Sequence, residues 1–291
     1  MEGKVNPREH DISYLEIYNI ETDEYRVVKR FEYVIEAPNW TKDGKALVYN
    51  SKGRIWRYDL ETDVEEEIFT GDIKGCNNDH VLSPDGTQIA ISSNTSDDIA
   101  SKIYVLPLEG GIPKLITPIG PSFLHGWSVD GQTLAYCAYR PEGRNISTIS
   151  VAGGEELKLT EGEFLNDGPE YAPNGKHIWF NSVRTGLMQA WRMNVDGSEQ
   201  TQMTFDLDRN TWFPHVSPDG EKIVMIAYKE GDVNPSDHPI HKDVELRFMS
   251  AEGGDIKVLR SFFGGQGTIN VNSWSPCSKS FAYVRYEIPQ L

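Results

Sequence analysis

Short runs of apolar residues that alternate with polar ones occupy most of the chain. In two of them, 133–137 (TLAYC) and 222–226 (KIVMI), the alternation has the two-residue period of a strand with one buried face. Gly, Pro, Asn and Asp separate these runs, as expected where the chain turns. The pattern predicts many short strands joined by turns.

The runs belong to a repeated unit, Trp-Ser-Pro-Asp-Gly followed by apolar residues. The Asp column of this unit reads Asp43, Asp85, Asp130, Asn174, Asp219 and Cys277. Successive members are 42, 45, 44, 45 and 58 residues apart, so the period is regular until the final step. Asp-Gly or Asn-Gly supplies the positive φ angles of a tight turn, and each unit is therefore predicted to be a β-hairpin. The last copy has lost its Asp-Gly.

A second hairpin pattern lies between these units, for example at 103–117 and 190–197. Two hairpins per repeat make the four-stranded blade of a β-propeller. One such hairpin, 14–29, precedes the first Asp-Gly unit, and the chain ends just after the last unit. We therefore predict an all-β fold, a six-bladed propeller of antiparallel blades in one domain (1–291), whose last blade is completed by N-terminal strands. Its inner hairpins are expected near 38–50, 80–92, 125–137, 169–181, 214–226 and 272–284.

The Ser-Pro-Asp-Gly hairpins resemble the WD40-like (PD40) repeat of TolB-like propellers, which also occurs in prolyl-oligopeptidase-type peptidases and oligogalacturonate lyases. The resemblance covers nearly the whole chain and implies the fold. It leaves the activity open, because these relatives include binding scaffolds, gating domains and enzymes. The chain has no Gly-x-Ser-x-Gly nucleophile elbow, the motif that the hydrolase domain of the peptidases would bring.

The charge and composition of the chain limit the classes of molecule that it could bind. The chain carries 28 Lys and Arg against 44 Asp and Glu, a formal net charge of −16, which argues against nucleic acid and anionic membranes. No run approaches the ~20 apolar residues of a membrane-spanning helix. Residues 1–6 lack the apolar core of a signal peptide, and 3 cysteines without a short spacing fit reduced thiols. A cytoplasmic location is expected.

Polar residues gather in the segments just before the turns. If each inner strand keeps its two-residue period, these residues line the channel mouth at the end opposite to the turns. Loops from the second to the third strand of each blade reach the same end. The candidate ligand-binding residues are Glu36, Asn78, His80, His125, Asp167, Glu170, Arg184, Arg209, Trp212, His215, Asn270 and Asn272.

Two classes of function fit this ring of candidate residues at the channel mouth. The first is a non-catalytic recognition module for a small polar ligand, such as a carbohydrate or sugar acid, or for a protein segment. A sugar would stack on Trp212, with carboxylates and amides on its hydroxyls and Arg184 or Arg209 on its carboxylate. The second is a carbohydrate-active enzyme, such as a metal-assisted oligosaccharide lyase resembling oligogalacturonate lyases. Its catalytic residues are not identified by the sequence.

A divalent metal in the central channel is a variant of the same hypothesis. His80, His125 and His215 could supply neutral imidazoles, with Asp167 or Glu170 as the hard ligand. The insertion 229–243 is the largest departure from the repeat and includes His238 and His241. Its polar composition predicts a solvated lid, with metal binding as the weaker alternative.

Overall fold

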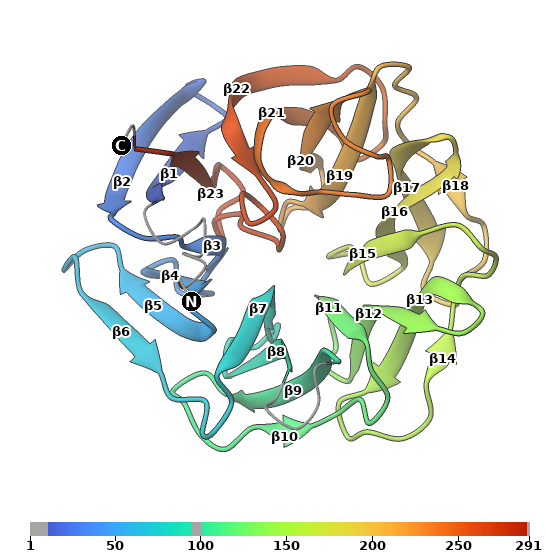
Figure 1. The fold of residues 1–291 in the computed structure, drawn as a ribbon, viewed down its shortest axis with the longest axis horizontal. Helices are drawn as coiled ribbons and strands as arrows, with labels where there is room; N and C mark the ends of the chain where they lie inside the picture. Colours follow the sequence, from blue (N-terminus) through green and yellow to red (C-terminus); the bar gives the residue numbers. More distant parts are fainter. Residues whose placement is uncertain (1–10, 95–99, 290–291) are drawn as a thin grey trace, which may run out of the picture.

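The computed structural model describes residues 11–94 and 100–289. Residues 1–10, on which the prediction of a missing signal peptide rests, lie outside this part of the chain. Six antiparallel sheets are arranged in a ring around a central axis (Figure 1). The six-bladed propeller predicted from the sequence is confirmed. In the described residues, no helix is long and apolar enough to cross a membrane.

Five blades are formed by consecutive strands, ordered from the centre outward. Blade 1 contains β3 (Glu36–Trp40), β4 (Ala46–Ser51), β5 (Arg54–Asp59) and β6 (Glu65–Ile68). Blade 2 contains β7 (Gly75–Leu82), β8 (Gln88–Asn94), β9 (Lys102–Pro107) and β10 (Lys114–Leu115). Blade 3 contains β11 (Ser122–Trp127), β12 (Thr133–Arg140), β13 (Gly143–Ser150) and β14 (Leu157–Lys158). Blade 4 contains β15 (Asn166–Tyr171), β16 (His177–Thr185), β17 (Leu187–Asn194) and β18 (Thr201–Gln202). Blade 5 contains β19 (Arg209–Val216), β20 (Lys222–Lys229), β21 (Ile240–Ser250) and β22 (Lys257–Gly265).

Blade 6 closes the ring with both ends of the chain. Its hydrogen-bonded sheet contains β2 (Glu24–Phe31), β1 (Ile12–Asn19) and β23 (Ser280–Glu287). The register of β1 and β23 runs without interruption from Ile12 opposite Glu287 to Asn19 opposite Ser280. The N-terminal strands therefore complete the last blade, as predicted, and leave β23 without an open edge on that side.

The innermost position of blade 6 differs from the predicted hairpin. Residues 268–274 form no regular strand and meet β23 through a single bridge between Trp274 and Phe281. Two further backbone hydrogen bonds connect the segment to β23: Ala282 N donates to Ser273 O at 3.0 Å, and Val284 N donates to Thr268 O at 3.1 Å. In Figure 1 this segment reaches in toward the centre of the ring.

The Asp-Gly turns have the local chemistry that the repeat implies. In blade 2, Ser83 Oγ donates to Asp85 Oδ1 at 2.6 Å, and Thr87 N donates to the same oxygen at 3.0 Å. Gly86 between them has a positive φ of 77°. The same Ser/Thr-to-Asp bond recurs in blades 1, 3 and 5. In the last repeat Cys277 replaces the aspartate, and Ser275 Oγ meets its Sγ at 3.4 Å instead.

A β-bulge interrupts each of the inner strands β3, β7, β11, β15 and β19. The register shifts fall between Glu36 and Asn39, Cys76 and His80, Leu124 and Gly126, Asp167 and Glu170, and Trp212 and His215. A bulge places two residues against one and thereby resets the alternation of faces. The two-residue period used to predict the ring therefore does not hold across these segments.

Candidate functional site: the turn-end pocket and its buried floor

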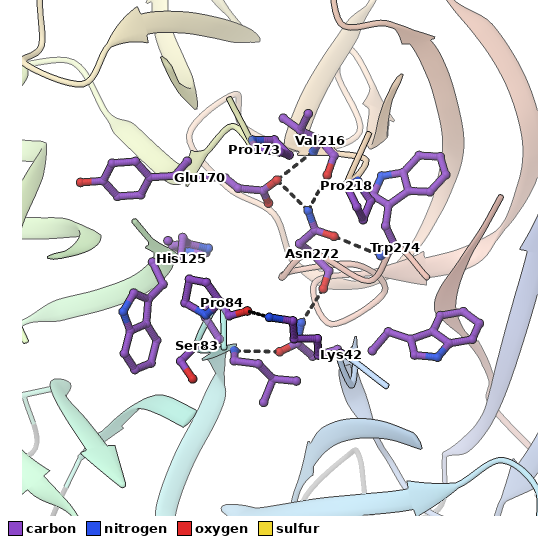
Figure 2. A pocket seen from close by; sticks show the side chains of 17 residues that line it. Lys42, Ser83, Pro84, His125, Glu170, Pro173, Val216, Pro218, Asn272 and Trp274 are labelled. Carbon is purple, nitrogen blue, oxygen red and sulfur yellow. Dashed lines mark hydrogen bonds between the residues drawn. The ribbon is translucent and has the colours of Figure 1, made fainter. Parts of the chain in front are cut away.

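A pocket of about 270 Å³ lies at the end of the channel where the Asp-Gly turns gather (Figure 2). All six blades contribute to its wall. The turn prolines Pro84, Pro173 and Pro218 form part of it. The remaining lining residues include the polar side chains Asn39, Lys42, His125, Glu170 and Asn272 and the aromatic ones Trp40, Trp127, Tyr171 and Trp274. The prediction that the site opens at the opposite end is wrong for His125, Glu170 and Asn272.

Glu170 joins three blades in the wall of this pocket. Its Oε2 lies 2.6 Å from His215 Nδ1, and its Oε1 accepts from Val216 N at 2.8 Å and from Asn272 Nδ2 at 2.7 Å. His215 Nε2 contacts the carbonyl oxygen of Ile269. Both imidazole nitrogens therefore lie against hydrogen-bond acceptors of the protein itself. Glu170, His215 and Asn272 are thus occupied in holding blades 4, 5 and 6 together.

Behind His125 lies a second group of polar side chains, which we call the channel floor: Asp79, His125, Asp167 and Asn270. His125 Nε2 is 3.5 Å from Asp167 Oδ1 and 3.7 Å from Asp79 Oδ1. Asn270 Nδ2 donates to Asp79 Oδ1 at 2.6 Å. All four side chains are buried and come from blades 2, 3, 4 and 6. They therefore meet where the blades converge on the axis.

Burial controls the protonation of the floor. Burial and the nearby charge of Asp167 raise the pKa of Asp79 to about 8. Burial raises the pKa of Asp167 to about 6 and lowers the pKa of His125 to about 3. Near neutral pH, Asp79 is protonated, Asp167 is ionised and His125 is neutral.

The insertion covers the floor from the other end of the channel. We call residues 230–239 the strap; it connects β20 to β21. His238 packs edge-on against Trp212 and Phe213, with ring centroids 4.4 and 5.2 Å apart, and its Nε2 is 4.0 Å from Asp167 Oδ2. Pro239 O accepts from Tyr228 OH at 3.0 Å and from Gln266 N at 3.2 Å. The His238 side chain is 21% exposed, and burial lowers its pKa to about 4. The predicted solvated lid is wrong at this residue, because His238 is inserted into the channel.

Several predicted ring residues lie elsewhere. Trp212 is 0% exposed, because the bulge in β19 turns it into the core, so its indole has no open face for a sugar. His80 is fully buried, neither ring nitrogen has a hydrogen-bond partner, and burial lowers its pKa to about 3. Glu36 Oε2 accepts from Asn50 Nδ2 within blade 1 at 3.1 Å, and Asn78 O accepts from Asn270 Nδ2 at 3.3 Å.

The two arginines expected to bind a carboxylate are held by their own blades. Arg184 donates to Ser182 Oγ, Gln200 Oε1 and Asn166 Oδ1, and its guanidinium lies 4.6 Å from the centre of the Trp191 ring. Arg209 donates to Asp208 Oδ2 at 2.6 Å and to Glu245 Oε1 at 2.8 Å. Neither is among the residues that line the turn-end pocket.

The residues proposed as metal ligands do not form a metal site together. Both nitrogens of His215 already have partners, and the buried nitrogens of His80 have no hydrogen-bond partner. Within residues 11–94 and 100–289, no group of three or more His, Cys, Asp or Glu side chains is arranged to hold a metal ion. The histidine trio therefore does not fit the divalent metal inferred from the sequence.

Two residues of the site, Asp79 and His238, are absent from the ligand-binding residues predicted from the sequence. Asp79 stands one position from the predicted face, at the bulge of β7. The equivalent positions in blades 1, 4 and 5 are Ala37, Gly168 and Phe213, all with positive φ. The glycine at 168 was the one sequence signal of this irregular backbone. His238 lies in an insertion that has no counterpart in the repeat, so the period could not place it.

Comparisons with known proteins agree with this architecture. Residues 119–255 match the family described as the TolB beta propeller domain, PD40. An uncharacterized protein of Agrobacterium fabrum is 46% identical over 275 residues, which cover 94% of this chain and 92% of that protein. The solved structure of a putative TolB from Agrobacterium tumefaciens superposes with a TM-score of 0.91 at 46% identity, covering 96% of this chain and 99% of that one.

More distant relatives are longer than this chain. The Tol-Pal system protein TolB of Francisella tularensis is 27% identical over 265 residues, and the match covers 86% of this chain but 56% of that protein. An oligogalacturonate lyase in complex with manganese shares the fold alone, with 14% identity, a TM-score of 0.55 and coverage of 86% of this chain and 67% of that one. The repeat, the closed ring of blades and the match at 46% identity over nearly the full length lead to one conclusion: the chain belongs to the TolB-like β-propeller family.

Proposed function

We propose that this propeller is a non-catalytic recognition module that binds a segment of a protein partner in the turn-end pocket. The observation that carries the proposal is the composition of the pocket wall. Four aromatic side chains and three turn prolines surround it, whereas the polar groups Glu170 and Asn272 are already bonded within the protein. Aromatic and proline surfaces of this kind suit the side chains of a protein segment better than a ring of sugar hydroxyls.

The relatives support this choice over the carbohydrate alternative. TolB of Francisella tularensis is named as a protein of the Tol-Pal system, which suggests association with other proteins. Because this chain spans 56% of that relative, its own partner is part of the proposal. The features expected of a sugar site, an open Trp212 face and free Arg184 and Arg209, are occupied within the protein. The lyase alternative relied on His80, His125 and His215 as metal ligands, and in the described residues these three do not form a metal site. A cytoplasmic location stays a prediction.

The proposal is tested by selecting peptides from a displayed random library on the purified protein. Selected peptides and a panel of neutral and acidic oligosaccharides are then assayed by thermal shift. A ligand at about 100 times its Kd should stabilise the protein by about 2.7 kcal/mol. Trp40→Ala removes an aromatic wall of the pocket and should abolish the shift. Trp56→Ala, on β5 of the same blade and outside the pocket, should retain it.

The competing outcomes are distinct. A peptide-induced shift that is lost in Trp40→Ala and kept in Trp56→Ala supports the proposal. Oligosaccharides that produce the Trp40-dependent shift, with no active peptide, would replace it with the carbohydrate function. Peptides whose binding is unaffected by Trp40→Ala would place recognition outside the pocket and overturn the proposal.

A further inference from the structure

The turn-end pocket is blind. At the far end of the channel the strap packs His238 against Trp212 and Phe213, and residues 268–274 reach across the axis to bond Asp79 and Glu170. Of the four channel-floor residues, His125 alone lines the pocket, and the other lining residues lie at the turn end (Figure 2). A volume of about 270 Å³ is that of roughly nine liquid waters. This space accommodates one long side chain and does not let a peptide chain pass through the channel.

The surroundings of the pocket are acidic. Glu170 is in its wall, and Asp79 and Asp167 lie behind His125. Among the lining residues Lys42 is the one lysine or arginine, and its Nζ is held at the rim by Pro84 O at 2.7 Å. The negative potential acts within the floor itself, because the charges of Asp167 and Glu36 add to burial in raising the pKa of Asp79. An inserted positive group would meet attraction from the carboxylates of Glu170 and Asp167, whereas Asp79 is protonated near neutral pH.

Two buried polar atoms at the pocket have no partner within the protein. His125 Nδ1 and Trp127 Nε1 both belong to lining residues that are more than nine-tenths buried. Such atoms are rare in folded proteins. Because an ammonium or guanidinium group carries hydrogen-bond donors only, it could bond His125 Nδ1 as an acceptor but not the donor Trp127 Nε1. Trp40, Trp127, Tyr171 and Trp274 line the same pocket, and indole and phenol rings attract organic cations through their electron-rich faces.

We propose that the pocket accepts the side chain of one lysine or arginine from the bound partner segment. This inference rests on the proposed function and specifies its partner chemistry. The aromatic wall favours an ammonium or guanidinium group over a bare metal ion, since in the described residues no three acidic, His or Cys side chains converge to hold a metal. Asp167 supplies the attraction from behind His125, and the side-chain stem packs between the aromatic rings.

The test uses small probes that differ in charge and little in shape: acetyl-arginine amide, its neutral analogue acetyl-citrulline amide, and acetyl-glutamate amide. Binding to the protein of residues 1–291 is followed through the indole N–H signals of Trp40 and Trp127 in NMR spectra at low salt. The arginine probe should bind about tenfold more tightly than the citrulline probe, and the glutamate probe should be weakest.

Two variants connect this preference to the floor. Asp167→Asn removes the ionised carboxylate and should reduce the preference for arginine to less than about threefold. Asp130→Asn, an exposed turn aspartate outside the pocket, is the matched control and should keep the full preference. An Asp130→Asn variant that loses the preference would mean that general surface charge, not the pocket, attracts the probe.

Failure of this inference is distinguishable from failure of the proposed function. Equal affinity for the arginine and citrulline probes overturns the inference, while peptide binding at the pocket can still be shown by the library selection. Calcium or magnesium ions alone that shift the same indole signals and displace the arginine probe would also overturn it. If neither the probes nor any selected peptide shifts these signals, the proposed function fails as well.

Discussion

The side-chain amide of Asn270 donates to the carboxyl group of Asp79 at 2.6 Å and joins the sixth blade to the second. This bond lies among buried groups, and the Asn270 Oδ1 atom on the other side of the amide has no partner. Burial and the charge of Asp167 raise the pKa of Asp79 to about 8, so this carboxyl group keeps its proton near neutral pH. The contact that joins these blades therefore involves an acid whose ionisation is unfavourable in the folded protein.

The first prediction is that Asp79→Asn makes the protein more stable at alkaline pH. The unfolded state releases the Asp79 proton near pH 3.9, whereas the folded state retains it until about pH 8. The contribution of Asp79 to stability is therefore highest below about pH 3.9, falls as the pH rises through this window, and is constant above it. Asn is neutral at every pH, so the variant should gain on the order of a few kcal/mol relative to the parent between pH 5 and 8. Urea unfolding at both pH values measures this gain.

Asp85→Asn is the matched control for this experiment. Hydrogen bonds from Ser83 and Thr87 lower the pKa of Asp85 to about 2, so its stabilising effect is lost only as the pH falls from about 4 toward 2. Between pH 5 and 8 its substitution should shift stability by a constant amount. If Asp79→Asn also shows a pH-independent effect, Asp79 is ionised in the folded protein near neutral pH.

The second prediction concerns the buried carboxylate that connects blades 5 and 6. Glu16 in β1 is bonded to Arg260 in β22 and to Arg285 and Tyr283 in β23. Glu16→Ala leaves two guanidinium groups without their partner and should destabilise the protein by about 3 kcal/mol. Lys279→Ala, which removes an ion pair to Glu21 with both side chains 56% exposed, should change the unfolding midpoint little. Equal effects of the two substitutions would show that the buried cluster is not an important contact between the blades.

The third prediction tests the closure of the ring. Deletion of residues 1–30 removes β1, the partner of β23, together with the buried side chains of Leu15 and Ile17. It exposes a long strand edge and part of the core, so we expect aggregation or loss of cooperative unfolding. A soluble truncated protein with an unchanged melting profile would contradict the importance of this strand pair.

The fold was predictable because its signals are local. Ser83, Asp85 and Gly86 determine a turn through bonds within five residues, and the same turn recurs at a regular step along the chain. Even the closure of the ring followed from the position of the first hairpin relative to the repeat. In blade 6, where Cys277 replaces the turn aspartate, the local signal is lost and the inner hairpin is irregular.

The site was less predictable because bulges and long-range contacts determine it. The face of Trp212 depends on an extra residue in β19, and the face of Asp79 depends on one in β7. The residue types at these positions do not indicate a bulge. Arg184 and Arg209 are charged in the sequence, but their partners Gln200 and Glu245 are 16 and 36 residues away. The contact of His238 with Trp212 depends on the path of an insertion that follows no repeat.

The last prediction is that His238 keeps the far end of the channel closed. His238→Ala removes the ring that packs on Trp212 and Phe213 and should destabilise the protein by about 1–3 kcal/mol. The Trp212 indole N–H is buried without a partner, so opening of the strap should speed its exchange with solvent, an effect measurable by NMR. His238→Phe keeps an aromatic ring at this position and should retain slow exchange. His177→Ala, in β16 of blade 4, controls for the loss of an imidazole outside the channel. Slow Trp212 exchange in His238→Ala would show that the strap closes the channel without this side chain, through the bonds of Tyr228 and Gln266 to Pro239.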